Sequence, residues 1–273
     1  MKTRPWLLWT LAFLIVAAAA VYQRMTGPTY PVRGTAALGA SEVRYRLLTS
    51  SDAPGDQEIR LAVPDSRVQG YIRLRRTPSH DPWRELPLIR QDDFLVVQIP
   101  HQPPAGKVMY QVFLETGADP ISLTDKPVIL RFRGAIPLYI LLPHVTCMFL
   151  AMLFSTACGL QALVKAGNFE KLALWTLAFL CAGGLILGPI QQKLAFGAFW
   201  TGWPFGGDLT DNKTVVAILF WAAALWRLRK RPGSRGWALA ASVVLMLVYM
   251  IPHSMLGSEI DYTQAVQGQS FSG

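Results

Sequence analysis

The stretch that decides the fold is IPLYILLPHVTCMFLAMLFSTACGLQALV, residues 136–164, which contains no Asp, Glu, Lys or Arg. About 20 consecutive apolar residues are enough for a helix to cross a bilayer. Three more stretches lack the same four residue types, and they are 172–190, 214–226 and 237–251. Because the uncharged residues gather in these stretches, the sequence predicts a C-terminal four-helix transmembrane bundle over residues 135–257.

The stretch 214–226 is the weakest of the four, since 13 residues are too few to cross a bilayer unaided. Extending this helix back to Leu209 gives it sufficient length. The extension also brings Asp211, Asn212 and Lys213 into its first turn. We therefore expect a transmembrane helix that begins with polar residues.

The chain opens with a short basic segment and a hydrophobic segment, Trp6–Tyr22. One interpretation is a signal anchor that is retained as an N-terminal transmembrane helix. The other is a signal peptide over residues 1–23, for which Ala17–Ala20 supply the small residues of a cleavage site. We favour the retained helix, and both interpretations send the following residues out of the cytoplasm.

Residues 24–134 have the composition of a soluble domain and carry strand signals at regular spacing. The runs are short, rich in β-branched and aromatic residues, and in part alternate apolar with polar positions. They are Val43–Leu48, Glu58–Val63, Val68–Leu74, Phe94–Ile99, Val108–Leu114, Ile121–Thr124 and Val128–Phe132. Such closely spaced short strands predict an all-β, immunoglobulin-like sandwich outside the cytoplasm.

Lys and Arg in the short loops set the sidedness of the helices, because such loops stay in the cytoplasm. Lys2 and Arg4 precede the first span. The basic residues between the last two spans are Arg227, Arg229, Lys230, Arg231 and Arg235. The N-terminus is therefore expected in the cytoplasm, and the β-domain and the polar tail 258–273 outside it. These loops account for much of the net charge of +9, which therefore does not indicate a nucleic-acid partner.

A pair of glycines and an aromatic-rich stretch indicate how the bundle packs and where it meets the membrane interface. Gly184 and Gly188 have the small-xxx-small spacing that lets helix backbones approach closely in lipid. The aromatic-rich stretch Phe196–Phe205 predicts a connector at the membrane interface, the depth that Trp200 and Trp203 prefer.

The predicted topology gathers ionisable residues at the outer boundary of the membrane. Those with ligand chemistry are His144, Asp208, Asp211, His253, Glu259 and Asp261, and Lys213 lies among them. Ionisable residues at membrane depth are costly and indicate function by default. Imidazoles and carboxylates together suit zinc, iron or manganese, so these six residues are candidate metal ligands.

Three other interpretations of the same residues stay open. A haem could be held between His144 and His253 on facing helices. The carboxylates could serve a proton or cation path. The third interpretation is structural: Asp208 and Asp211 would stabilise a helix start, and Lys213 would pair with an acidic neighbour. No HExxH spacing, Ser/His/Asp grouping or phosphate loop is recognisable, so an enzyme activity is neither indicated nor excluded.

Three stretches resemble a family of uncharacterised bacterial membrane proteins. They are Leu141–His144, Phe199–Thr214 and Ile251–Tyr262, and the resemblance covers most of the chain beyond its first strand signals. The resemblance implies a periplasmic β-domain joined to a helical bundle in the bacterial inner membrane. It implies no established activity.

The leading functional hypothesis is an accessory or assembly subunit that binds partner proteins through its periplasmic β-domain and its membrane helices. The alternative is a membrane-embedded metal-binding protein or enzyme with a His/carboxylate site at the periplasmic face. Within the β-domain, Arg73, Arg75 and Arg76 form a basic patch. This patch is either a solvated strand face or a contact for anionic lipid or an acidic partner.

Overall fold

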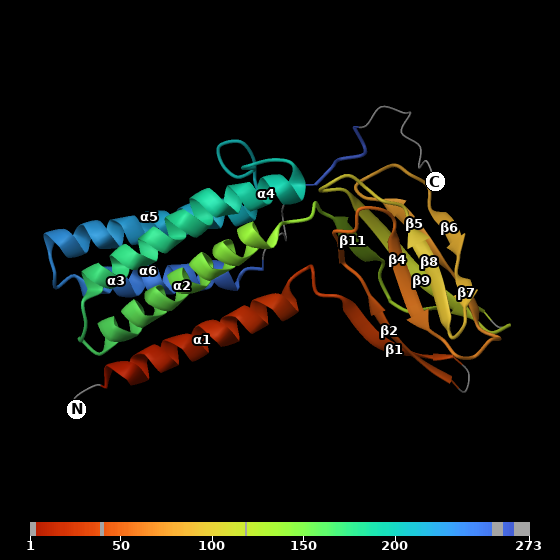
Figure 1. Cartoon of the computed structure of the whole chain (residues 1–273), viewed down its shortest axis with the longest axis horizontal. Helices are drawn as coiled ribbons and strands as arrows, with labels where there is room; N and C mark the ends of the chain where they lie inside the picture. Colours follow the sequence, from red (N-terminus) through yellow and green to blue (C-terminus); the bar gives the residue numbers. More distant parts are fainter. Residues whose placement is uncertain (1–3, 39–40, 118, 253–258, 265–273) are drawn as a thin grey trace. The chain divides into compact units, whose positions relative to one another are not determined.

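The computed structural model describes residues 4–38, 41–117, 119–252 and 259–264, and it divides into two compact units (Figure 1). The helical unit comprises Met1–Pro28 and Ile136–Ser258. The β-unit comprises Thr29–Ala135 and Glu259–Gly273. The chain therefore passes from the helical unit into the β-unit and back, and residues 259–264 belong to the β-unit again.

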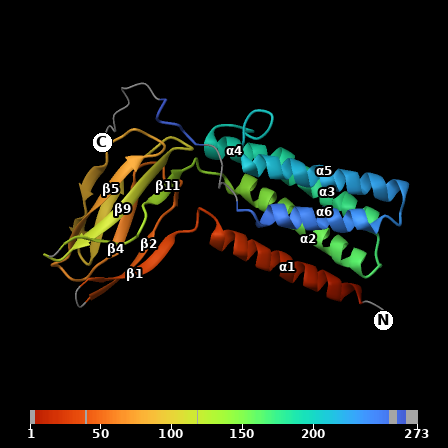
Figure 2. The same ribbon diagram turned by 180° about the vertical axis from the view of Figure 1, so that it is seen from behind.

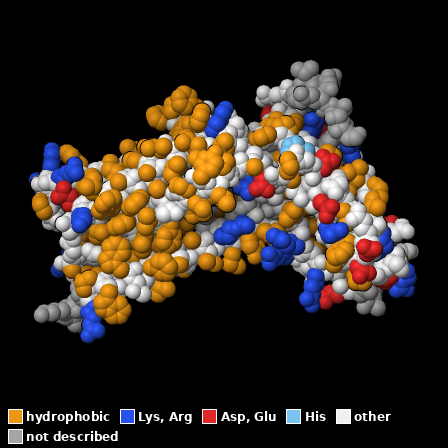
Figure 3. Space-filling view, in the orientation of Figure 1, with side chains coloured by type: hydrophobic (Ala, Val, Ile, Leu, Met, Phe, Trp, Pro, Cys, Tyr) orange, Lys and Arg blue, Asp and Glu red, His pale blue; other side chains and the backbone are white. Residues whose placement is uncertain are grey.

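The helical unit consists of α1 (Pro5–Thr26), α2 (Leu138–Leu163), α3 (Phe169–Leu180), the π-helix η1 (Cys181–Leu187), α4 (Gly188–Phe196), α5 (Leu209–Lys230) and α6 (Arg235–Met250). Among the described residues, three helices are long and apolar enough to cross a membrane: α1, α2 and the continuous helix Phe169–Phe196. Side chains over this unit are mostly hydrophobic, whereas charged side chains gather on the β-unit and at helix ends (Figure 3).

The other two predicted spans correspond to α5 and α6. Helix α5 has 22 residues, but Asp211 and Lys213 lie near its start and three basic residues lie in its last turn. Helix α6 has 16 residues, which extend about 24 Å at the usual helical rise. Crossing of the membrane by α5 and α6 therefore stays a prediction.

Close backbone approach holds these helices together. Helix α2 packs against α1, α3 and α6, and α5 packs against α3 and α6 (Figure 2). The approach expected at Gly184 is present, since a Cβ there would lie 2.6 Å from Cγ2 of Thr214 on α5. A Cβ at Gly159 would lie 2.5 Å from Oγ of Ser242 on α6, and Ser242 also donates to the carbonyl oxygen of Ser155.

The β-unit contains eleven strands within the described residues. They are β1 (Val32–Leu38), β2 (Ser41–Leu47), β3 (Ser50–Ser51), β4 (Gln57–Ala62), β5 (Gln69–Arg76), β6 (Arg84–Pro87), β7 (Ile89–Gln91), β8 (Phe94–Ile99), β9 (Lys107–Glu115), β10 (Ile121–Ser122) and β11 (Val128–Phe132). Each of the seven predicted runs overlaps a strand, and β8 and β11 have the expected bounds. The short or Gly/Ala-containing strands β1, β3, β6 and β7 were not predicted.

The strands form three sheets. One is the β1–β2 hairpin, one has the order β3-β11-β9-β5-β6 with β10 beside β9, and one has the order β4-β8-β7. Their inner faces share one hydrophobic core. In β9, Val108, Tyr110, Val112 and Leu114 are all fully buried, as the alternation predicts. The protein thus combines β-sheets with apolar helices, and an immunoglobulin-like connection of the sheets stays a prediction.

Candidate functional site

The six candidate metal ligands belong to two different units. His144, Asp208 and Asp211 lie in the helical unit, and Glu259 and Asp261 lie in the β-unit. His253, the sixth, falls outside the described residues, as does any contact it makes. Within the described ranges, no group of three His, Cys, Asp or Glu side chains is arranged to hold a metal ion. The metal and haem hypotheses therefore stay predictions, and the described acidic groups have other partners.

Asp211 holds the connector between α4 and α5. Its Oδ2 accepts hydrogen bonds from the backbone N–H groups of Thr201 and Gly202 at 2.7 and 2.8 Å. The side-chain amide of Gln192 donates to the same oxygen at 3.3 Å. Asp211 is buried. A buried carboxylate that accepts from several N–H groups fixes the backbone around it. Asp211 thus anchors the connector to the first turn of α5.

Asp208 and Asn212 complete this anchor. Asp208 is the N-cap of α5, as the structural interpretation expects, and accepts from the N–H of Thr210 at 2.8 Å. Its other oxygen accepts from the hydroxyl of Thr201 at 3.0 Å. Oδ1 of Asn212 accepts from the N–H of Trp203 at 2.7 Å. We call Asp208, Asp211 and Asn212 the loop clamp.

The loop clamp presents a set of aromatic side chains. We call residues 197–207 the aromatic loop; in it Phe199 is 57% exposed, Trp203 is 73% exposed and Phe205 is 83% exposed. A Cβ at Gly202 would lie 2.5 Å from Cβ of Asp211, so this close contact requires glycine. Two of the carboxylates that suggested a metal site, Asp208 and Asp211, are therefore bonded to this apolar loop.

His144 and Lys213 bond to backbone carbonyls. Nδ1 of His144 lies 3.0 Å from the carbonyl oxygen of Gly183, which belongs to the π-helix η1. Nζ of Lys213, a buried residue, donates to the carbonyl oxygen of Ile251 at 2.6 Å, just past the end of α6. The carbonyl oxygen of Gly183 also accepts from the N–H of Gly188, so His144 is its second partner, whereas a carbonyl at a helix end lacks the usual helical donor. Both side chains thus connect neighbouring elements through a backbone carbonyl.

The other two acids lie in the tail, where Glu259 bonds to a strand of the β-unit and Asp261 bonds within the tail itself. Glu259 forms an ion pair with Lys107, at the start of β9. Next in the chain, the N–H of Ile260 donates to the carbonyl oxygen of Ala105. Asp261 accepts from the N–H and the hydroxyl of Thr263, which lowers the pKa of its carboxyl group. We call residues 259–264 the tail strap.

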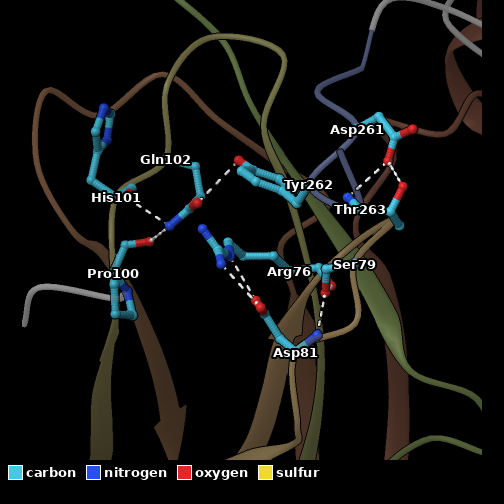
Figure 4. A network of polar contacts seen from close by, with 9 residues as sticks. All are labelled: Arg76, Ser79, Asp81, Pro100, His101, Gln102, Asp261, Tyr262 and Thr263. Carbon is cyan, nitrogen blue, oxygen red and sulfur yellow. Dashed lines mark hydrogen bonds and ion pairs between the residues drawn. The ribbon is translucent and has the colours of Figure 1, made fainter. Parts of the chain in front are cut away.

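Tyr262 is the buried centre of the tail strap (Figure 4). Its hydroxyl donates to Oε1 of Gln102 at 3.1 Å, and its N–H donates to the carbonyl oxygen of Pro78. The guanidinium of Arg76 lies 4.7 Å from the centre of its ring and binds both oxygens of Asp81, at 2.6 and 3.0 Å. Burial raises the pKa of Tyr262, and the hydrogen bonds from Arg76 lower the pKa of Asp81. Arg76, one of the three arginines of the predicted basic patch, thus packs on Tyr262 of the tail strap.

A second surface of the β-unit contains Arg73 and Arg75 of the predicted basic patch, together with aromatic residues that were not predicted as part of a site. On the outward face of β5 and β9, Tyr71 stacks on Phe113 with ring centres 5.1 Å apart. Arg73 and Arg75 lie on the same face and both stack on Trp83, at 5.6 and 4.8 Å. Nε of Arg75 also lies 3.2 Å from the sulfur of Met109, and Arg73 pairs with Glu85. We call this surface the Tyr71 face.

A sequence signal for the Tyr71 face was present. The alternation that buries Val108 and Tyr110 in β9 directs Met109, Gln111 and Phe113 to the opposite side of the strand. What the sequence lacked was the pairing of Arg75 with Met109 and of Tyr71 with Phe113. Strand register decides which outward residues meet, and one strand alone does not reveal it.

Comparison with models of known protein families gave no match, and comparison with proteins of curated function gave no similar protein. The function is therefore argued from the geometry of the loop clamp, the tail strap and the Tyr71 face.

Proposed function

We propose that this chain is an integral membrane accessory or assembly subunit that binds partner proteins through its β-unit and its membrane helices. In this proposal α1, α2 and the helix Phe169–Phe196 cross the bacterial inner membrane, and α5 and α6 complete a four-helix bundle after α1. The β-unit is an immunoglobulin-like sandwich on the periplasmic side, and the aromatic loop lies at the membrane interface.

The tail strap supports this topology. The β-unit precedes α2, and the tail strap that follows α6 belongs to the same unit. The chain between Ile136 and Glu259 therefore starts and ends on one side of the membrane, which requires an even number of crossings. With α2 and Phe169–Phe196 as two of them, α5 and α6 cross together or neither crosses.

Contacts between two turns favour crossing by both α5 and α6. Nε of Arg229, near the end of α5, lies 3.2 Å from the carboxylate of Glu170 at the start of α3. Arg235, at the start of α6, donates to the carbonyl oxygen of Ala162 near the end of α2. The α5–α6 turn thus lies beside the α2–α3 turn, and its Arg and Lys residues favour a cytoplasmic position for both.

The observation that carries the partner-binding proposal is the composition of the Tyr71 face. Tyr, Trp, Phe, Met and Arg are the residue types enriched at the centres of protein interfaces, and Trp, Tyr and Arg contribute most of the binding energy there. Tyr71, Phe113 and Trp83 are already stacked against neighbours, so little side-chain freedom would be lost on binding. This face therefore suits a protein partner.

Gentle detergent extraction from the native membrane, followed by mass measurement of the intact complex, tests the proposal. We expect the wild-type chain to elute with a stoichiometric partner polypeptide. The Tyr71→Ala/Trp83→Ala variant should lose that partner, because interface aromatics typically contribute about 2 kcal/mol or more each. Phe94→Ala is the matched control, since Phe94 also lies under an arginine, Arg60, but in another sheet.

Recovery of the wild-type chain alone would contradict the proposal. If the Tyr71→Ala/Trp83→Ala variant and Phe94→Ala retain the partner equally, the partner binds a surface other than the Tyr71 face.

A further inference from the structure

The β1–β2 hairpin carries an arginine-rich outward face. Residues directly opposite in an antiparallel pair point to the same side, and Arg33 is opposite Arg46 while Thr35 is opposite Arg44. Val43 and Leu47 alternate with these arginines and are buried in the core, so the arginines point outward. All three arginines are exposed. We call Arg33, Arg44 and Arg46 the arginine face.

The arginine face carries three positive charges, against one negative charge on the same outward side of β2, that of the exposed Glu42. Like charges directly opposite each other in a sheet destabilise the strand pair, and Arg33 and Arg46 are in that position. The ion pairs in the described part of the chain include none with these three arginines. Guanidinium groups form bidentate hydrogen bonds with phosphate and carboxylate. An anion between Arg33 and Arg46 would remove the repulsion.

The covalent chain keeps this face close to a membrane helix. Helix α1 ends at Thr26 and β1 begins at Val32. The connecting residues can extend about 20 Å at most, so the start of the hairpin stays near the end of α1. In the proposed function, on which this inference rests, α1 crosses the membrane, so that phosphate headgroups at its end come within reach of the start of the hairpin.

We propose that the arginine face binds the phosphate groups of anionic phospholipids in the membrane that α1 enters. The occupant is a lipid headgroup because the tether at Thr26 limits how far the hairpin moves from the bilayer surface. The attraction between basic residues and anionic lipid falls off within a Debye length, so it acts only on groups held at that surface. Docking of this kind would fix the β-unit against the bilayer independently of any partner on the Tyr71 face.

The test uses the full chain in nanodiscs with a fluorophore at one introduced cysteine, Thr35→Cys, after replacement of Cys147, Cys158 and Cys181 by alanine. Thr35 is exposed and opposite Arg44. A quencher attached to lipid headgroups reports contact between hairpin and membrane. We expect stronger quenching in discs that contain phosphatidylglycerol than in discs of phosphatidylcholine alone, and we expect high salt to abolish the difference.

The variant that removes the charge is Arg33→Gln/Arg44→Gln/Arg46→Gln. Its preference for anionic lipid should fall on the order of 100-fold, since each basic residue at a membrane surface contributes roughly fivefold. The matched control is Arg60→Gln/Arg67→Gln/Arg133→Gln, which removes three charges from other parts of the β-unit and should retain the preference. Thermal unfolding of both variants verifies that they are folded.

Equal quenching in both kinds of disc, or equal quenching in the wild type and the Arg33/Arg44/Arg46 variant, would overturn the proposal. Added inorganic phosphate tests whether the arginine face binds a soluble phosphate rather than a lipid headgroup. If added phosphate displaces the hairpin from phosphatidylglycerol discs at concentrations that leave salt screening unchanged, the face binds a soluble anion, and the assignment to lipid is wrong.

Discussion

Asp211 of the loop clamp and two acids of the β-unit, Asp81 and Glu259, use their carboxylates in different ways. In the helical unit, Asp211 is buried and its partners are backbone N–H groups, with no arginine or lysine ion pair described. In the β-unit, Asp81 and Glu259 are paired with Arg76 and Lys107. Asp211 organises the loop beside it, whereas Asp81 and Glu259 each neutralise a cation. Acidic residues that the predicted topology places at the same boundary of the membrane thus need not bind the same ligand.

The largest expected effect is in the loop clamp. Asp211→Ala leaves the N–H groups of Thr201 and Gly202 without their acceptor in a buried position. This should cost about 2–4 kcal/mol, because each unsatisfied buried donor costs about 1–3 kcal/mol. Thermal unfolding in detergent measures the loss, and proteolysis should become faster within the aromatic loop. Asp261→Ala, at an exposed position, is the control, and an equal loss in both variants would refute the contrast drawn above.

Close packing in the helical unit gives the next effect. Gly184→Ala places a methyl group 2.6 Å from Cγ2 of Thr214, so the helices must separate, at a cost of about 1–3 kcal/mol. Gly233→Ala is the matched control, because nothing lies within 4 Å of a Cβ there. The unfolding temperature should fall for Gly184→Ala alone. Tolerance of alanine at position 184 would mean that η1 and α5 do not approach as described.

The ion pair between Arg76 and Asp81, beside Tyr262 of the tail strap, predicts a pH dependence. Since Arg76 lowers the folded-state pKa of Asp81, the pair stabilises the protein above the unfolded-state pKa of about 4. That stability is lost as the pH falls through the folded-state value. Asp81→Asn should therefore be less stable than the wild type by about 1–2 kcal/mol at neutral pH. The difference should close in acid, and a difference independent of pH would show that the charge on Asp81 does not matter.

The smallest effect concerns one hydroxyl group. Tyr262→Phe removes the hydrogen bond to Gln102 but keeps the ring under Arg76, which should cost about 1 kcal/mol. Tyr262→Ala should cost more, since it also empties a buried site. Hydrogen exchange of residues 259–264 should rise in the order wild type, Tyr262→Phe, Tyr262→Ala. Unchanged exchange in Tyr262→Ala would mean that the tail strap is not held by this residue.

Local pattern was sufficient for much of the fold. The uncharged run at 136–164 predicts α2, and the alternation in Val108–Leu114 predicts β9, because burial imposes a period on the sequence. The N-cap at Asp208 is also local, since the accepting carboxylate and the N–H of Thr210 that donates to it are two residues apart. Short strands such as β6 were missed because four residues ending in proline give no period to detect.

The candidate site was harder to predict because its contacts are distant in sequence or depend on a loop conformation. Tyr262 and Gln102 are 160 residues apart, and no pattern around Tyr262 indicates burial in the β-unit. The predicted topology placed Asp211 and Glu259 at the same boundary of the membrane. It did not reveal that Asp211 bonds to the aromatic loop and Glu259 to Lys107. Which partner an acid takes depends on backbone geometry within a few ångströms.

In the proposed topology, the β-unit, the loop clamp and the tail strap lie on one side of the membrane. The most direct test is labelling of single introduced cysteines by a membrane-impermeant thiol reagent in intact spheroplasts. The positions are Gly55 in the β-unit, Gly207 beside the loop clamp, Gln264 in the tail strap and Gly233 between α5 and α6. We predict that the first three are labelled from outside and that Gly233 is labelled only after permeabilisation. Labelling of Gly207 and Gly233 from the same side, or protection of Gln264 while Gly55 reacts, would contradict the account.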